Sequence, residues 1–268
     1  MTIYNYYPGC TLSTKAKKLD RTARRCAEKL GFPLVELPEW QCCGAVYPQA
    51  PDAVGERLAA VRALAAARDN GGVLVALCSA CYHVLKRVND DMANVSSIRD
   101  TVNGYLDLER PYAGETKVSH YLEVLRDTVG WKRLASLVTH PLTGQRVGGY
   151  YGCLLLRPGR VMALDDPEAP VILEEFLRAL GAEAVLYDER NECCGSYLSV
   201  TQPAYCREMT DRILRSAADA GAERLVTACP LCAYNLVHQR GREQQVGVVY
   251  FTELLAQALG LTEGGDAQ

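Results

Sequence analysis

The feature that most constrains this chain is a five-cysteine pattern that occurs twice. Each copy has a single cysteine, then two adjacent cysteines followed by glycine, then a C-x-x-C. In both copies 34 residues lie between the adjacent pair and the C-x-x-C. Between the single cysteine and the adjacent pair there are 31 residues in the first copy and 39 in the second. The first set is Cys10, Cys42, Cys43, Cys78 and Cys81, and the second is Cys153, Cys193, Cys194, Cys229 and Cys232. Five positions repeated in this way indicate a gene duplication.

Other residues repeat together with the cysteines. "YYPGC" at 6–10 matches "YYGC" at 150–153, "VALCSACYHVL" at 75–85 matches "VTACPLCAYNL" at 226–236, and "VSHYLEVL" at 118–125 matches "VVYFTELL" at 248–255. Two copies are too few for a solenoid, so the pattern indicates two related domains. We expect an N-terminal domain over 1–140, a C-terminal domain over 141–262 and a flexible tail over 263–268.

The hydrophobic pattern predicts alternating strands and helices. Short β-rich segments lie at 3–7, 33–37, 72–77, 146–151, 182–187, 223–228 and 246–251. Between them run helical stripes, two of which end at Gly31 and Gly181, the residue type typical of a helix C-terminus. After each adjacent cysteine pair we expect a loop and then a helix that begins with proline, at Pro51 and at Pro203. The alternation predicts an α/β fold of two duplicated repeats, each a Rossmann-like parallel sheet flanked by helices, in a pseudo-twofold arrangement.

This fold would gather each set of cysteines at one edge of a sheet. Ligands of parallel sheets bind at the carboxyl ends of the strands. Cys10, Cys78, Cys153 and Cys229 each follow a predicted strand. We therefore expect the five cysteines of each set to lie close together.

The number and spacing of the thiols favour a polynuclear metal group. Twelve cysteines in a chain of 268 residues without an export signal indicate metal binding or redox chemistry before disulfides. Zinc takes four ligands, whereas a larger iron–sulfur cluster can be held at several points by thiolates. Gly44 and Gly195 would permit the turn that brings adjacent thiols to one centre. A zinc site and purely structural thiols remain alternatives on spacing alone.

At these residues the chain resembles a known family. Each half is similar to a CCG domain, and the pair resembles the B-type subunit of heterodisulfide reductase over nearly the whole chain. "PLTGQRVGGYYGCLLLRPG" at 141–159, "DDPE" at 165–168 and "TACPLCAYNL" at 227–236 resemble that subunit in particular. The resemblance implies two CCG repeats, in each of which the five cysteines hold one noncubane [4Fe-4S] cluster. Gly44 and Gly195 would lie beside these two clusters.

The resemblance also implies an activity and partners. Such a subunit reduces a disulfide like that of coenzyme M and coenzyme B, or oxidises thiols in reverse, with each cluster delivering one electron. It works in a complex with a helical ferredoxin-like iron–sulfur subunit and a flavoprotein subunit. This chain has no G-x-G-x-x-G after a strand to bind flavin itself. The alternatives are an electron-transfer or membrane-docking subunit of a respiratory dehydrogenase that passes electrons to quinone, and a related subunit of sulfur oxidation.

Three further residues are of interest. His120 could supply a proton to a product thiolate, although a hydrogen-bonded structural histidine is the more common role. Cys26 and Cys206 lie outside the duplicated pattern, on apolar helix stripes, and we expect both to pack in the core.

Composition excludes several classes of partner. The formal net charge of −3 without a basic run argues against nucleic acid. The longest largely apolar stretch, 71–85, is too short to span a membrane, and the N-terminus lacks a secretory signal, so we expect a cytoplasmic protein. The basic, amphipathic segment 131–142 could lie on a membrane, but we expect it to pack on the core as an ordinary surface helix.

Overall fold

The chain folds around two four-stranded sheets. The computed structural model describes residues 4–44, 52 and 54–261. The first sheet has the order β2-β1-β3-β4 and the second the order β6-β5-β7-β8, and all pairings are parallel. The strands are β1 (Tyr4–Tyr7), β2 (Leu34–Glu36), β3 (Val73–Ala76), β4 (Lys117–His120), β5 (Arg146–Tyr150), β6 (Glu183–Val185), β7 (Arg224–Thr227) and β8 (Gly247–Tyr250). The predicted α/β fold with duplicated halves is confirmed.

Helices connect the strands in the same sequence in both repeats. The first repeat contains α1 (Gly9–Ser13), α2 (Lys17–Leu30), α3 (Gly55–Asp69), α4 (Ser79–Asn94), α5 (Ser96–Leu106), α6 (Tyr121–Val124), the π-helical turn η1 (Leu125–Val129) and α7 (Trp131–Leu137). The second contains α8 (Gly159–Met162), α9 (Ile172–Ala179), the 3₁₀ turns η2 (Asp188–Asn191) and η3 (Ser196–Leu198), α10 (Pro203–Asp219), α11 (Pro230–His238) and α12 (Phe251–Ala258). Gly31 ends α2 with a positive φ of 85°, as its position in the sequence predicts.

Two details differ from the sequence prediction. The hydrophobic pattern does not predict strand β4, because its four residues carry only one strong β-former, Val118; it is held as a strand by pairing along the edge of β3. The predicted proline start of the first helix is wrong, since α3 begins at Gly55 and Pro51 lies outside the described residues. Asp52 lies just before this helix, and its Oδ1 accepts from the backbone N–H groups of Val54 and Gly55. Pro203 is the first residue of α10, as predicted.

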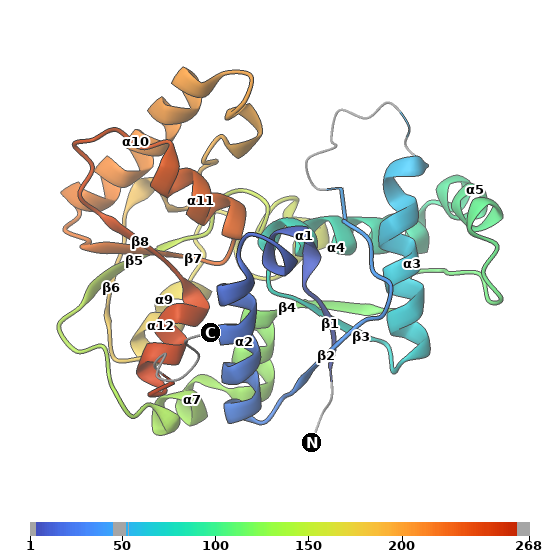
Figure 1. Ribbon diagram of the computed structural model, residues 1–268, viewed down its shortest axis with the longest axis horizontal. Helices are drawn as coiled ribbons and strands as arrows, with labels where there is room; N and C mark the ends of the chain where they lie inside the picture. The colour runs from blue at the N-terminus through green and yellow to red at the C-terminus, as the bar shows by residue number, and fades with distance from the viewer. Residues whose placement is uncertain (1–3, 45–51, 53, 262–268) are drawn as a thin grey trace.

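The two repeats share one hydrophobic core. Figure 1 shows the two sheets side by side, with α2 and α12 packed between them. Buried side chains of both repeats, including Phe32, Tyr121 and Phe251, form one continuous cluster. The contact continues at the carboxyl ends of the sheets, where the Tyr250 hydroxyl donates to the Leu77 carbonyl at 2.6 Å. The carboxyl ends of β3 and β7 therefore face each other.

Segment 131–142 turns its apolar side to this core. Leu134 of α7 is fully buried, and the Trp131 indole lies against Phe176 and donates to Glu175 at 2.9 Å. The expected packing of this helix on the core is confirmed. Within the part of the chain that the structure describes, no helix is long and apolar enough to cross a membrane.

Candidate metal centre

The cysteines follow the strands at the switch point of each sheet. In the first repeat β1 and β3 are neighbours, but the chain leaves them in opposite directions, to β2 and to β4. Such a switch point opens a crevice at the carboxyl ends of the two strands. Cys10 follows β1, and Cys78 and Cys81 open α4 directly after β3. The second repeat repeats this placement, with Cys153 after β5 and Cys229 and Cys232 at the start of α11.

The first set of five cysteines comes together as neighbouring pairs. The Cys42 and Cys10 sulfurs lie 3.4 Å apart, and the Cys43 and Cys81 sulfurs lie 3.5 Å apart. Cys78 in turn forms a hydrogen bond with Cys81. Three separate segments thus deliver their thiols to one place.

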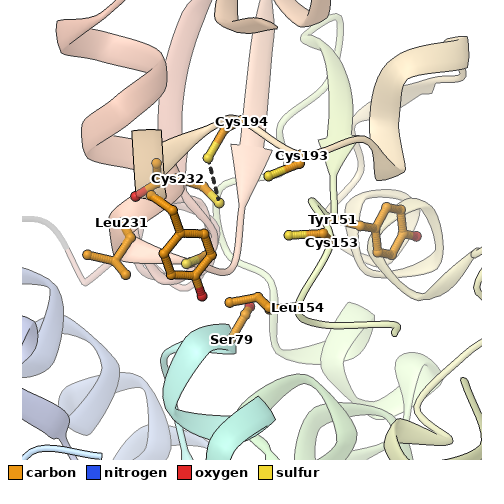
Figure 2. Close-up of a pocket in the computed structure, with 11 residues that line it drawn as sticks. Ser79, Tyr151, Cys153, Leu154, Cys193, Cys194, Leu231 and Cys232 are labelled. Atoms are coloured by element: carbon orange, nitrogen blue, oxygen red, sulfur yellow. Dashed lines mark hydrogen bonds between the residues drawn. The ribbon is translucent and has the colours of Figure 1, made fainter. Parts of the chain in front are cut away.

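The second set lines a single small cavity of about 20 Å³. In Figure 2 the sulfurs of Cys153, Cys193, Cys194 and Cys232 turn toward a shared space. Cys194 and Cys232 lie 3.5 Å apart, and Cys153 forms a hydrogen bond with Cys193. Cys229, the fifth member, lines the same cavity and bonds to Cys232.

The two sets meet each other. The thiols of Cys78 in the first set and Cys229 in the second are close enough for each to shift the pKa of the other. Ser79 belongs to the first repeat but lines the cavity of the second, and its hydroxyl donates to the Ala228 carbonyl at 2.9 Å. The two groups of thiols therefore form one continuous site across the interface between the repeats.

Glycines permit this close approach of the sulfurs. Gly9 has a φ of 73°, and a Cβ built on it would lie 2.6 Å from the Cys81 sulfur. Gly44 and Gly195, which follow the adjacent pairs, have φ values of 74° and 73°, as the turn predicted from the sequence requires. The Gly195 N–H points back to Cys193 and donates to its sulfur at 3.3 Å.

Two thiols of the second set, Cys229 and Cys193, have lowered pKa values, whereas hydrogen bonds with neighbouring cysteines raise the pKa of Cys153 and of Cys232. Hydrogen bonds from Cys232 and Cys78, together with the backbone N–H groups of Cys232 and Leu231 at the start of α11, hold the pKa of Cys229 well below its usual value. A hydrogen bond from Cys153, with a smaller contribution from the Gly195 N–H, lowers the pKa of Cys193 to about 6. The thiolate is the form of cysteine that binds metal.

The donor set fits a polynuclear group. Within the described ranges no three His, Cys, Asp or Glu side chains gather closely enough to hold a single metal ion. Instead, five sulfurs lie around a common space in the second repeat, and the five of the first repeat lie in adjoining pairs. Iron–sulfur clusters are held by thiolates that reach them from several sides.

Two buried tyrosines position the adjacent cysteine pairs, and the sequence analysis did not identify them as site residues. The Tyr7 hydroxyl donates to the Gln41 carbonyl, directly before Cys42. In the second repeat the Tyr150 hydroxyl donates to the Glu192 carbonyl at 2.8 Å, directly before Cys193. The signal was present, because a tyrosine stands three residues before the first cysteine of each set.

A larger cavity of about 270 Å³ adjoins the cysteine sites. Cys43 lines it from the first set, and Leu154 and Tyr197 line both this cavity and that of the second set. Its wall also carries Arg57, which is ion-paired with Glu56 and Asp91, and Arg87. Arg87 makes no hydrogen bond or ion pair within the described part of the chain. A molecule in this cavity would contact Cys43 and a cation, and it would lie beside Leu154 and Tyr197, which also line the cavity of the second set.

His120 lies between the repeats and outside both cavities. Its ring is fully buried against Tyr82 and Phe251, and its Nδ1 accepts from the Leu122 N–H at 3.2 Å. Burial lowers the pKa of His120 to about 4, so the imidazole is neutral. Its Nε2 has no hydrogen-bond partner among the described residues. The role of His120 as a proton donor stays a prediction.

The two cysteines outside the pattern are fully buried. Cys26 packs between α2 and α12, its sulfur 3.9 Å from the Thr252 carbonyl, and burial raises its pKa to about 12. Cys206 lies on α10 beside the second set, with its sulfur 3.7 Å from the Cys194 carbonyl. Cys206 therefore contacts the backbone of a predicted ligand, which packing alone did not predict.

Comparison with known proteins agrees with this arrangement. The model of the cysteine-rich CCG domain matches residues 4–86 and 147–237, which include all ten cysteines of the two sets. The chain belongs to the CCG family. This CCG protein is 30% identical to the 8-methylmenaquinol:fumarate reductase membrane anchor subunit of Wolinella succinogenes, over 96% of this chain and 92% of that protein.

Other relatives carry the name that the sequence resemblance suggested. The B-type subunit of the ferredoxin/F(420)H(2)-dependent CoB-CoM heterodisulfide reductase of Methanosarcina acetivorans is 28% identical, over 98% of this chain and 91% of its own length. A protein of Archaeoglobus profundus that is named as similar to the same subunit is 29% identical, over the whole of this chain and 93% of its own. The resemblance to this subunit is confirmed.

Among solved structures, a hypothetical protein from Helicobacter pylori has the same fold. It superposes with a TM-score of 0.73 over 97% of this chain, at 14% sequence identity. This chain spans about half the length of that protein, 49%. At this identity the likeness concerns the fold alone.

Proposed function

We propose that this CCG protein is an iron–sulfur subunit of a multi-subunit oxidoreductase and that it reduces a disulfide, or oxidises thiols in reverse. Each set of five cysteines would hold one noncubane [4Fe-4S] cluster. The observation that carries this proposal is the meeting of two complete sets across the interface: Ser79, next to Cys78, lines the cavity of the second set and bonds to Ala228, next to Cys229, and a larger cavity lined by Cys43 adjoins it. When bound, two such clusters supply one electron each, which matches the two electrons that a disulfide takes up.

The residues of the larger cavity would bind and orient the substrate. Leu154 and Tyr197 line both the larger cavity and that of the second set, so a disulfide held there would lie against Cys43 of the first set and beside the second. Arg87 on the wall has no ion pair among the described residues and suits an anionic group at one end of the substrate. The Tyr197 hydroxyl can donate a hydrogen bond to a departing sulfur. The disulfide takes up two electrons and two protons, its S–S bond breaks, and two thiols leave.

The electrons would come from other subunits. The relatives in methanogenic archaea are named as subunits of heterodisulfide reductases, and this supports a partner in the same complex. We propose a helical ferredoxin-like iron–sulfur subunit as the direct donor, which in turn receives electrons from a flavoprotein subunit. A cytoplasmic location and a domain boundary near residue 140 belong to the same proposal.

A second function is favoured by one relative. The Wolinella succinogenes protein, at 30% identity, is named as a membrane anchor of a reductase that uses a quinol. On that model the two sets would pass electrons between a quinone and a flavoprotein, and no disulfide would be cleaved.

One experiment separates the two functions. The chain is purified anaerobically with its partners, its iron and acid-labile sulfide are measured, and the complex is offered either an anionic disulfide with reduced methyl viologen or a menaquinone analogue. We expect the iron of two four-iron clusters and disulfide-dependent oxidation of the viologen. Cys193→Ala should remove about half of the iron and abolish this turnover, because on this proposal each set holds one cluster and both clusters must deliver an electron. Full disulfide activity in Cys193→Ala, or turnover with the quinone alone, would contradict the first proposal.

A further inference from the structure

The loop that carries the second adjacent cysteine pair is held by two buried residues of neighbouring helices. Asn235 lies on α11, three residues after Cys232, and its side chain is 2% exposed. Cys206 lies on α10 and is fully buried. Neither belongs to the five-cysteine pattern, and neither lines the two cavities described above.

Both residues bond to the backbone of a predicted ligand. The Asn235 Nδ2 donates to the Cys194 carbonyl, and it lies 3.2 Å from the Cys206 sulfur. The Cys206 thiol in turn lies 3.4 Å from the Asn235 Oδ1 and 3.7 Å from the Cys194 carbonyl. The thiol donating to Oδ1 and the amide donating to the carbonyl form one consistent network.

This network fixes the turn after the cysteine pair. The Cys194 carbonyl belongs to the peptide group that leads into Gly195, whose φ is 73°. Gly195 is packed tightly, since a Cβ on it would lie 2.9 Å from the Met209 sulfur and 3.4 Å from the Cys206 Cα. Holding this peptide orients both thiols, because the Gly195 N–H bonds to the Cys193 sulfur and the Cys194 sulfur lies 3.5 Å from Cys232.

The first repeat has different residues at the matching positions. Asn235 is three residues after the second cysteine of its C-x-x-C, and the residue three after Cys81 is Val84, which has no polar side-chain atom. Cys206 is 12 residues after the second cysteine of its adjacent pair, and the residue 12 after Cys43 is Gly55, which has no side chain. Within the part of the chain that the structure describes, the two repeats therefore share their thiols but not this network.

We infer that Asn235 and Cys206 are positioning residues specific to the second set and make the two cysteine sets unequal. They hold the Cys194 peptide so that the second set keeps its geometry and retains bound iron. The inference rests on the proposed function as far as iron is concerned. The geometry that it requires of the Cys194 thiol does not depend on any bound group.

The first test follows iron release to a chelator under anaerobic conditions. It uses two backgrounds, Cys10→Ala with Cys42→Ala, which leaves only the second set complete, and Cys153→Ala with Cys193→Ala, which leaves only the first. We expect Asn235→Leu to speed iron release from the second set about tenfold, because one buried hydrogen bond is lost. The rate of iron release from the first set should stay unchanged. Cys206→Ala should do the same, whereas Cys206→Ser should restore the slow rate, because its hydroxyl still donates.

Val84→Leu is the matched control in the first repeat and should leave release from the second set unchanged. An equal increase in both backgrounds would show a general loss of folding and overturn the inference. An unchanged rate in the second set, or no rescue by Cys206→Ser, would overturn it as well.

The second test needs no iron and keeps the two proposals separate. Alkylation of each thiol in the metal-free chain is followed by mass spectrometry. Cys194 is 3% exposed, and Asn235→Leu should speed its alkylation while the rate at Cys43 stays the same. If the wild-type chain retains no iron, the proposed function fails, but the alkylation rate of Cys194 still tests the inference. An unchanged Cys194 rate would overturn the inference whether or not iron is bound.

Discussion

Single side chains at the site differ in what they do, and the tyrosines that hold the cysteine loops show this most directly. Tyr7 and Tyr150 are fully buried, and each bonds to the carbonyl before an adjacent cysteine pair. A tyrosine hydroxyl that is buried needs a partner, and its removal takes this donor away from a partly buried hydrogen bond that holds the cysteine loop. The two residues are equivalent in the two repeats, so they can be compared with each other.

Tyr150→Phe and Tyr7→Phe should each lower the free energy of unfolding by about 0.5–1.5 kcal/mol, the net contribution of one hydrogen bond. The measurement is anaerobic urea denaturation of each variant. Tyr105→Phe is the control, because Tyr105 is 71% exposed and its hydroxyl should contribute nothing measurable. Equal stability of all three variants would mean that the two buried hydrogen bonds do not support the loops.

We expect Arg87 to affect substrate binding and not the stability of the fold. Arg87→Gln should raise KM for an anionic disulfide roughly tenfold while kcat changes little, because one charge-assisted hydrogen bond to the substrate is lost. Steady-state kinetics of the complex provides the measurement. The neighbouring Lys86→Gln is the control, since Lys86 lies over the Tyr82 ring and lines a different cavity. An unchanged KM in Arg87→Gln would mean that Arg87 does not bind an anionic group of the substrate.

At the scale of elements, the site depends on how closely α1 and α4 approach each other. Gly9 opens α1 with a φ of 73°, and any Cβ there would collide with the Cys81 sulfur at the start of α4. The strand ends bring these helices together, but only a residue without a side chain lets the thiols come into contact.

Gly9→Ala should therefore displace Cys81 and lower the iron bound by the first set, in addition to about 1–2 kcal/mol of backbone strain. Iron and sulfide analysis in a chain with only the first set complete gives the measurement. Gly104→Ala is a matched control, because Gly104 lies in α5 with nothing within 4 Å of its Cβ position. There the substitution should be neutral or stabilising. Full iron content in Gly9→Ala would show that the site tolerates a wider separation.

At the scale of the whole molecule, the interface between the repeats holds a neutral histidine. His120 packs on Tyr82 of its own repeat and on Phe251 of the other, and its pKa is lowered from 6.5 to about 4 by burial. The unfolded chain therefore takes up a proton at higher pH than the folded chain. Stability is complete above pH 6.5 and is lost as the pH falls toward 4.

As the pH falls from about 7.5 to 5.5, protonation of this histidine alone should lower the free energy of unfolding by about 1.4 kcal/mol. Anaerobic denaturation at both pH values, in wild type and His120→Asn, gives the measurement. The variant should show a smaller fall than wild type by about that amount, since the titrating ring is gone. Identical falls in wild type and His120→Asn would mean that His120 is not neutral in the folded state.

Local pattern and duplication in the sequence were enough to predict the type of fold and the placement of the thiols within it. The spacing of ten cysteines, the glycines after the adjacent pairs and the alternation of strands and helices led to a duplicated parallel α/β fold with thiols at the carboxyl ends of strands. These are consequences of periodicity, of backbone freedom at glycine and of where parallel strands end. The relation of Tyr7 to Tyr150 was also visible as a repeat, although its meaning was not.

Only the tertiary structure decided how the two repeats meet. The contact of Cys78 with Cys229, the reach of Ser79 to Ala228 and the network of Asn235, Cys206 and Cys194 join segments that are far apart in the chain. Strand β4 likewise exists because β3 offers it a partner, not because its residues favour a strand. Local patterns report how a segment buries its own apolar side. Which segment lies opposite depends on the packing of the shared core, and no repeat or period encodes that choice.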